Sequence, residues 1–127
     1  MFKKIDHIKI NTGKFDDTLQ FYQDVLGFTL KTKESSDLAM LQLGDCMVEI
    51  KGCESDTPPP SGQEHLGYRM MALEVEDMGQ TAAYLREKGI DFRSGPVTLG
   101  LFVQAEIVDP NGIPIALRQW LAPLPTV

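Results

Sequence analysis

The sequence predicts an α+β fold built from two tandem βαβββ modules, and three observations support this class. Two segments, residues 6–30 and 69–93, share the order of alternating strand, polar helix start, amphipathic helix and glycine. Strand signals follow each helix. A segment rich in Pro, Ser and Gly, without periodicity, separates the two halves. We therefore expect a single domain over residues 1–127, with module one at about 3–53, a linker at about 54–66 and module two at about 67–121.

Module one begins with the alternating stretch IDHIKIN at residues 5–11, a predicted strand whose Ile8 and Ile10 face the helix. In the helix that follows, apolar residues recur at i, i+3 and i+7, namely Leu19, Tyr22 and Leu26. We expect Asp16 or Asp17 to cap the N-terminal amides of this helix, and Gly27 to end it. Further strands are predicted at residues 28–33, 38–44 and 46–52.

Module two repeats this order. Its first strand carries apolar residues at alternate positions, namely Met71, Leu73 and Val75. Its helix carries them at i, i+4 and i+7, namely Met78, Ala82 and Leu85, and is expected to end at Gly89. Further strands are predicted at residues 90–95, 102–109 and 113–120, with a tight turn at the DPNG stretch.

Composition limits the kind of partner. The 127 residues include 12 basic and 18 acidic side chains, and the resulting net charge of -6 repels nucleic acids and anionic membranes. No stretch approaches the roughly 20 apolar residues of a membrane span, and the N-terminus lacks the apolar run of a signal peptide. We therefore expect a cytoplasmic protein that binds a small molecule and neither nucleic acid nor membrane.

Five stretches in this order, DHIKI, FYQDVLGF, VEI, ALEVEDM and DPNGIPIALRQ, give the chain a family resemblance. It resembles the vicinal oxygen chelate superfamily, which includes glyoxalase I, bleomycin-resistance proteins, methylmalonyl-CoA epimerase and extradiol dioxygenases. The resemblance implies that the curved mixed sheets of the two modules form a ligand cup, with the helices on the convex side. It also implies a homodimer, with the cup formed either within one chain or across two.

In metal-dependent members of that family, the first and last strands of each module supply the ligands. Carried over by position, the resemblance assigns His7 and Glu49 to this role in module one. In module two, Met70 and Ala116 stand where the family usually has His and Glu. A divalent ion needs three or four well-placed ligands, so we expect a degenerate metal site and no cofactor. The alternative is a divalent metal, Zn, Ni, Mn or Fe, held by His7, Glu49 and further ligands.

Three interpretations of His7 and Glu49 stay open. They are metal ligands, or they contact the ligand and act in acid/base catalysis, or they form a structural hydrogen-bonded pair. An extradiol dioxygenase is disfavoured, because it needs two histidines and a carboxylate around Fe(II). The only other histidine, His65, falls in the predicted linker.

Strand alternation predicts the rest of the cup lining. Ile5, Lys9 and Asn11 share a face with His7, and Met47 and Lys51 share one with Glu49. In module two the lining is expected to include Met70, Ala72, Glu74, Ala116, Arg118 and Trp120. The predicted ligand-binding residues are Lys9, Met47, Lys51, Tyr68, Met70, Ala116, Arg118 and Trp120.

This lining suits a small apolar or aromatic ligand with an anionic end, which an arginine can hold in a bidentate fork. The alternative is that Lys9, Lys51 and Arg118 lie at strand ends in solvent, paired with Glu74 or Glu106. Tyr22 and Phe102 are expected in the core. Tyr68 and Trp120 fit a core position or a stacking surface equally well.

The leading hypothesis is a glyoxalase- or bleomycin-resistance-like protein that binds a small organic molecule in the cup beside a degenerate metal site. One alternative is a metal-dependent lyase or isomerase of the lactoylglutathione lyase or epimerase type, with His7 and Glu49 as its catalytic groups. Another is a resistance protein that sequesters a drug without catalysis, for which the net charge of -6 suits a cationic compound.

Overall fold

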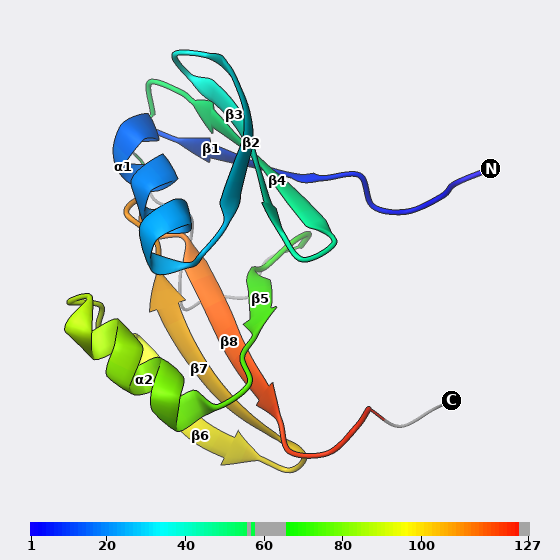
Figure 1. Ribbon diagram of the computed structural model, residues 1–127, viewed down its shortest axis with the longest axis vertical. Helices are drawn as coiled ribbons and strands as arrows, with labels where there is room; N and C mark the ends of the chain where they lie inside the picture. Colours follow the sequence, from blue (N-terminus) through cyan, green and yellow to red (C-terminus); the bar gives the residue numbers. More distant parts are fainter. Residues whose placement is uncertain (56, 58–65, 125–127) are drawn as a thin grey trace. The chain divides into compact units, whose positions relative to one another are not determined.

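The computed structural model describes residues 1–55, 57 and 66–124, so most of the predicted linker, including His65, lies outside the described residues. The chain divides into two compact units, Met1–Pro58 and Pro59–Val127. Each unit has one four-stranded mixed sheet and one helical segment (Figure 1). The predicted α+β class is confirmed, while the predicted bounds of domain and modules stay a prediction. In the described part of the chain, no helix has the length and apolar character needed to cross a membrane.

In the first unit, sheet A has the strand order β1-β4-β3-β2. Its elements are β1 (Ile8–Thr12), α1 (Phe15–Gln20), the π-helical turn η1 (Phe21–Val25), β2 (Thr29–Ser35), β3 (Leu38–Leu43) and β4 (Cys46–Gly52). β1 pairs with β4 in parallel, and the other pairs are antiparallel. The core of this unit lies between the sheet and the helical segment, and its buried residues include Leu19, Tyr22, Phe28, Leu41, Val48 and Ile50.

Two details of the helical segment differ from the predictions. Lys14 occupies the N-cap and makes no side-chain cap bond, so the expected cap by Asp16 or Asp17 is wrong. Both aspartates lie in the first turn of the helix, where their negative charge interacts favourably with the helix dipole. The segment then widens into η1, since the amide of Leu26 donates to the carbonyl of Phe21, five residues back. Apolar spacing does not reveal such a widening.

In the second unit, sheet B has the strand order β5-β8-β7-β6. Its elements are β5 (Met71–Glu74), α2 (Met78–Glu87), β6 (Ser94–Leu99), β7 (Phe102–Val108) and β8 (Pro114–Trp120). β5 pairs with β8 in parallel, as β1 pairs with β4 in sheet A. Both helical segments end as predicted, because Gly27 and Gly89 adopt positive φ angles of 82° and 75°.

The strand predicted at residues 90–95 is wrong, because β6 spans Ser94–Leu99. The alternating Ile90 and Phe92 suggested a strand, but the Ile90 amide donates to the carbonyl of Leu85 and so completes the end of α2. The strand itself begins just after the Arg93 amide pairs with the carbonyl of Glu106. Pro96 lies within β6, an edge strand, where a missing backbone donor is tolerated.

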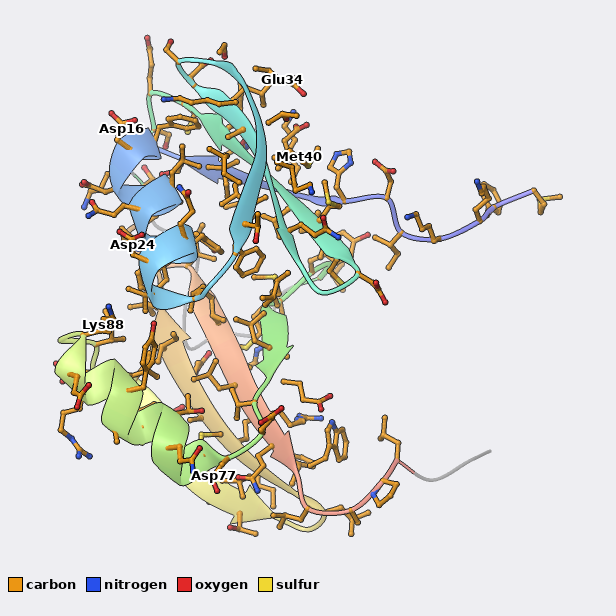
Figure 2. All side chains as sticks on the ribbon, in the orientation of Figure 1. Asp16, Asp24, Glu34, Met40, Asp77 and Lys88 are labelled. Atoms are coloured by element: carbon orange, nitrogen blue, oxygen red, sulfur yellow. The ribbon has the colours of Figure 1, made fainter. Side chains whose placement is uncertain are left out.

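Helix α2 fixes which face of sheet B carries which side chains. The Asp77 carboxylate caps the helix by accepting from the Gln80 amide at 2.8 Å, and Asp77 and Lys88 mark its two ends in Figure 2. The first helical amide, that of Met78, donates to the side-chain oxygen of Gln119 in β8 at 2.7 Å. Gln119 therefore faces α2, together with the buried residues Ile115 and Leu117.

By alternation, Ala116, Arg118 and Trp120 point to the opposite face, which we call the helix-free face of sheet B. Phe102 pairs with Trp120 across the sheet and lies on this same face. Phe102 is half-buried, so its predicted core position is wrong, whereas that of Tyr22 is confirmed. The Phe102 ring is therefore only partly shielded from solvent.

Candidate functional site

The face of sheet A that points away from α1 carries the first-module residues that were predicted to line the cup.

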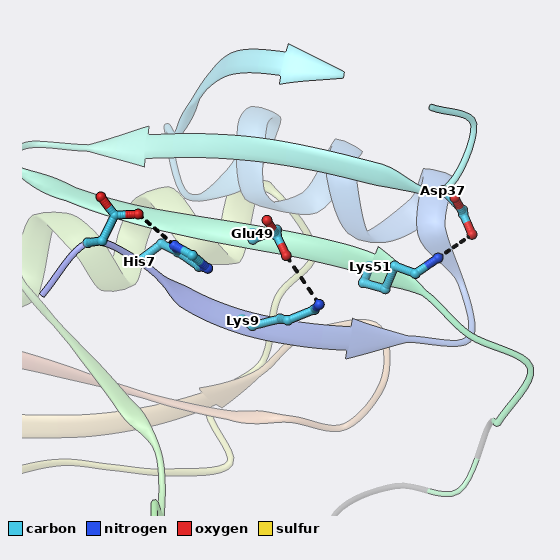
Figure 3. A network of polar contacts seen from close by, with 6 residues as sticks. His7, Lys9, Asp37, Glu49 and Lys51 are labelled. Carbon is cyan, nitrogen blue, oxygen red and sulfur yellow. Dashed lines mark hydrogen bonds and ion pairs between the residues drawn. The ribbon is translucent and has the colours of Figure 1, made fainter. Parts of the chain in front are cut away.

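 Alternate residues of β1 and of β4 point to this face, as the sequence predicted. Lys9 of β1 is the parallel register partner of Glu49 in β4, and Asn11 is the partner of Lys51. Figure 3 shows His7, Lys9, Glu49 and Lys51 on this side of the two strands, with α1 behind them. We call this side the helix-free face of sheet A.

His7 lies just before β1, and its ring turns toward its neighbour in sequence. The Nδ1–H group donates to the Asp6 carboxylate at 2.8 Å, and 34% of the His7 side chain is exposed. This hydrogen bond lowers the pKa of Asp6 below its usual value. Within the described residues, His7 and Glu49 share no hydrogen bond, so the interpretation of these two as a hydrogen-bonded pair is wrong.

Glu49 is the more enclosed of the two predicted catalytic residues. Its side chain is 15% exposed, and its Oε1 atom lies 3.4 Å from the Nζ atom of Lys9. The cation compensates the charge that partial burial would otherwise disfavour. Chemically, Glu49 offers one carboxylate on a face that also carries the half-buried Met47. Such a group can accept a hydrogen bond or a proton from a bound molecule.

Lys51 is held at the far end of the same face. Its Nζ atom donates to the Asp37 carboxylate at 2.6 Å. That bond, together with one from the Ser35 hydroxyl, lowers the pKa of Asp37 below its usual value. The predicted partners of Lys9 and Lys51, Glu74 or Glu106, are therefore wrong. The actual partners come from within the first unit, at β4 and at the turn before β3.

Replacing Lys51 with Met should raise the pKa of Asp37 toward its ordinary value, because the largest lowering contribution is removed. A carboxyl whose pKa is lowered by folding stabilises the fold above its unfolded pKa of about 4, and loses this effect as the pH falls. A pH titration of the side-chain carboxyl signal by NMR measures the change. Lys9→Met is the matched control, and an equal rise of the Asp37 pKa in both variants would contradict the assignment.

The second unit brings the predicted module-two positions to the helix-free face of sheet B. Ala116 pairs with Ala72 of β5 and with Glu106 of β7, and only 4% of it is exposed. Met70 precedes β5 and is half-buried, and Tyr68, further upstream, is exposed. Glu74 of β5 is the register partner of Arg118.

These residues do not fit the metal site that the resemblance implies. Ala116 has no ligand atom, and the Met70 thioether is a poor ligand for hard or borderline ions. On sheet A, the Glu49 carboxylate already pairs with Lys9 and the His7 ring already pairs with Asp6. In residues 1–55, 57 and 66–124, no group of three or more His, Cys, Asp or Glu side chains lies close enough to hold an ion. We therefore assign no chemical step to a metal.

Four neighbouring residues on sheet B form what we call the Arg118 cluster: Phe102, Gln104, Arg118 and Trp120. The Arg118 Nε and Nη2 groups both donate to the Gln104 side-chain oxygen, at 2.9 Å for Nε. The guanidinium carbon lies 3.8 Å from the centroid of the Phe102 ring and 5.2 Å from that of Trp120. The two rings meet edge to face at 5.3 Å.

Sequence reasoning named Arg118 and Trp120 but missed Gln104 and the role of Phe102. The missed signal is the hairpin symmetry of β7 and β8. The pairing of Val108 with Pro114 centres the hairpin on Asn111, and counting seven residues outward from there pairs Gln104 with Arg118. The DPNG stretch alone does not give this register, because a tight turn over residues 109–112 would pair Gln104 with Leu117 instead.

Comparisons with a family model, with known proteins and with solved structures all find glyoxalase-type proteins. The family model described as Glyoxalase/Bleomycin resistance protein/Dioxygenase superfamily matches residues 4–117. A probable lactoylglutathione lyase of Synechocystis sp. is 31% identical over 124 residues, which cover 89% of this chain and 92% of that protein. The lactoylglutathione lyase of Haemophilus influenzae is 31% identical over 121 residues, which cover 88% and 89%. The crystal structure of a glyoxalase family protein from Enterococcus faecalis matches with a TM-score of 0.79 and 30% identity, covering 92% of this chain and 98% of that chain.

Proposed function

Because this chain belongs to the Glyoxalase/Bleomycin resistance protein/Dioxygenase superfamily, we propose that it binds a small organic molecule and does so without a metal ion. The observation that carries this proposal is the set of residues at the four family ligand positions. His7 and Glu49 remain in the first unit, whereas Met70 and Ala116 supply no comparable ligand in the second. We therefore propose that this chain shares small-molecule binding with its family but does not use the metal ion of the metal-dependent members.

The proposed binding residues lie on the helix-free faces of both sheets or beside them. On the first unit they are His7, Lys9, Met47, Glu49 and Lys51. On the second they are Tyr68, Met70, Ala116, Arg118 and Trp120. Partial burial of Glu49 and of Arg118 supports a role in recognition, because a polar group that is shielded from water binds its partner more strongly than an exposed one. A cytoplasmic homodimer is part of the same proposal.

A second candidate is an isomerase or lyase, which the names of the two lactoylglutathione lyase relatives favour. Glu49 would then accept a proton from carbon, and His7 would assist it. This candidate needs groups beyond these two to stabilise the charge that develops on the substrate. Turnover of a bound compound distinguishes it from binding alone.

A thermal-shift screen with a library of small organic molecules tests the proposed function. A compound that binds only the folded protein raises its melting temperature, by an amount that grows with concentration. We expect at least one compound to do so in the presence of a chelator, and Glu49→Gln to weaken its binding about tenfold through loss of a charged hydrogen-bond partner. Asp45→Asn, which removes an exposed carboxylate from the β3–β4 turn, is the matched control. The absence of any stabilising compound would contradict the proposal.

A further inference from the structure

We infer that Arg118 anchors the carboxylate end of a small organic monoanion on sheet B. This inference rests on the proposed function, since it names the class of molecule that the protein binds. It starts from the charges on the helix-free faces. Three cations were predicted to recognise an anion, and the structure leaves only one of them, Arg118, without an ionic partner among the described residues.

The two lysines are already neutralised within the first unit. Lys9 lies 3.4 Å from the Glu49 carboxylate, and Lys51 lies 2.6 Å from that of Asp37. An anion that bound either lysine would have to displace a carboxylate of the protein. Arg118 instead bonds to a neutral amide, Gln104, which keeps the full positive charge of the guanidinium available.

The hydrogen bonds of Arg118 to Gln104 use one edge of the guanidinium group and leave a second edge available for a ligand. The Nε and Nη2 groups share the Gln104 oxygen, which occupies the side edge of the guanidinium. An arginine has five N–H donors in a planar fork. The end edge, formed by Nη1 and the second hydrogen of Nη2, therefore remains for a carboxylate, which accepts two parallel hydrogen bonds from such an edge.

The rings of the cluster hold the fork in place and provide an apolar contact. The guanidinium lies over Phe102 at 3.8 Å from the ring centroid, a distance at which the cation is attracted to the ring. All four residues of the cluster are half-buried. A partly desolvated cation without an anionic partner costs free energy, and a bound carboxylate would offset this cost.

The surrounding charges favour a monoanion over a dianion. Glu74 is the register partner of Arg118, and Glu106 is that of Ala116, so two carboxylates lie at neighbouring positions of the same face. They would repel a phosphate more than a carboxylate, since Coulomb repulsion grows with charge. Ala72 and Ala116 add small apolar side chains next to Arg118. We therefore assign the ligand to monocarboxylates with an apolar or aromatic body.

The test uses Trp120, which is the only tryptophan of the chain and a member of the cluster. Its fluorescence is followed while the full-length protein is titrated with benzoate, phenylacetate, indole-3-acetate and hexanoate, and with the primary amide of each. We expect a saturable change with at least one acid and binding of its amide that is weaker by about tenfold or more. Inorganic phosphate should bind more weakly than that acid.

Three variants assign the effect to Arg118. Arg118→Gln should weaken the acid at least about tenfold, and Arg118→Lys should fall between this variant and the native protein, because it keeps the charge but loses the fork. Arg86→Gln, which removes an exposed arginine from the last turn of α2, is the control and should leave the affinity within about twofold. Melting temperatures confirm that each variant folds, and the Lys variant serves if the Gln variant does not.

Any of three results would overturn the inference. The acid and its amide bind equally well, Arg118→Gln binds the acid as tightly as the native protein does, or no acid changes the fluorescence. The thermal-shift screen separates this failure from that of the proposed function. If neutral compounds stabilise the protein while the acids do not bind, the protein binds small molecules without an arginine anchor. If no compound in either experiment binds, both proposals are wrong.

Discussion

The double variant Met70→His with Ala116→Glu should bind Zn(II) or Ni(II) on the order of 100-fold more tightly than the native protein, since two added ligands contribute several kcal/mol and each 1.4 kcal/mol is about tenfold. The resemblance implies that these two positions, with His7 and Glu49, supply the metal ligands in family members. The change would convert a set of two ligand side chains into one of four. Calorimetric titration of each ion into metal-free protein measures the gain.

The control for this variant is Met70→Leu with Ala116→Gln, which has side chains of similar size but lacks the imidazole and the carboxylate. Because Ala116 is only 4% exposed, a larger side chain there is expected to lower stability in both double variants. The single variant Met70→His avoids this cost and should still gain about tenfold in affinity. If the folded variants bind metal no better than the control, the family positions have been assigned to the wrong residues.

The variant Gly95→Ala should lower the free energy of unfolding by about 3 kcal/mol, from a strained backbone and a steric clash together. Gly95 has a φ of +73°, and a Cβ atom there would lie 2.5 Å from the carbonyl oxygen of Gln104 and 3.0 Å from the Cα atom of Ala105. Both are backbone atoms of β7, so they cannot move aside as a flexible side chain would. Urea denaturation measures the loss.

Gly100→Ala is the matched control for this effect. Gly100 has a similar φ of +65°, but nothing lies within 4 Å of the added Cβ atom. It should therefore cost only the strain of the left-handed backbone, about 1–2 kcal/mol. Equal losses in the two variants would mean that the contact between β6 and β7 at Gln104 is not as close as described. Since Gln104 holds Arg118, Gly95→Ala should also change the fluorescence of Trp120.

Much of the fold could be predicted because the signals were local. The helix α2 combines a regular apolar spacing with a glycine stop, and the buried Met78 and Leu85 lie where that spacing placed them. The start of α1 and the extent of β6 could not be predicted in the same way. In the first, the aspartates lie inside the helix rather than at its cap. In the second, Ile90 alternates like a strand residue but closes the end of a helix.

The sequence predicted which residues share a sheet face, but not which side chains contact one another. Alternation within each strand, combined with the ligand positions that the resemblance implies, placed Lys9 on one face with Glu49 and Arg118 on one face with Glu74. The register of the structure agrees, because both pairs are register partners. Which atoms meet depends on side-chain torsions, and these are set by packing rather than by the local sequence. The sequence therefore could not show that Lys51 binds Asp37, 14 residues away. The partners of Arg118 needed the register of the β7–β8 hairpin.

The most direct test of the central claim, a binding protein that works without a metal ion, is the metal content of the protein as purified, combined with its melting temperature before and after chelation. We expect well under one ion per chain and an unchanged melting temperature, and the same result after addition of Zn(II), Ni(II), Mn(II) or Fe(II). About one tightly bound ion per chain, with a melting temperature that falls on chelation and recovers when the ion is restored, would contradict the claim.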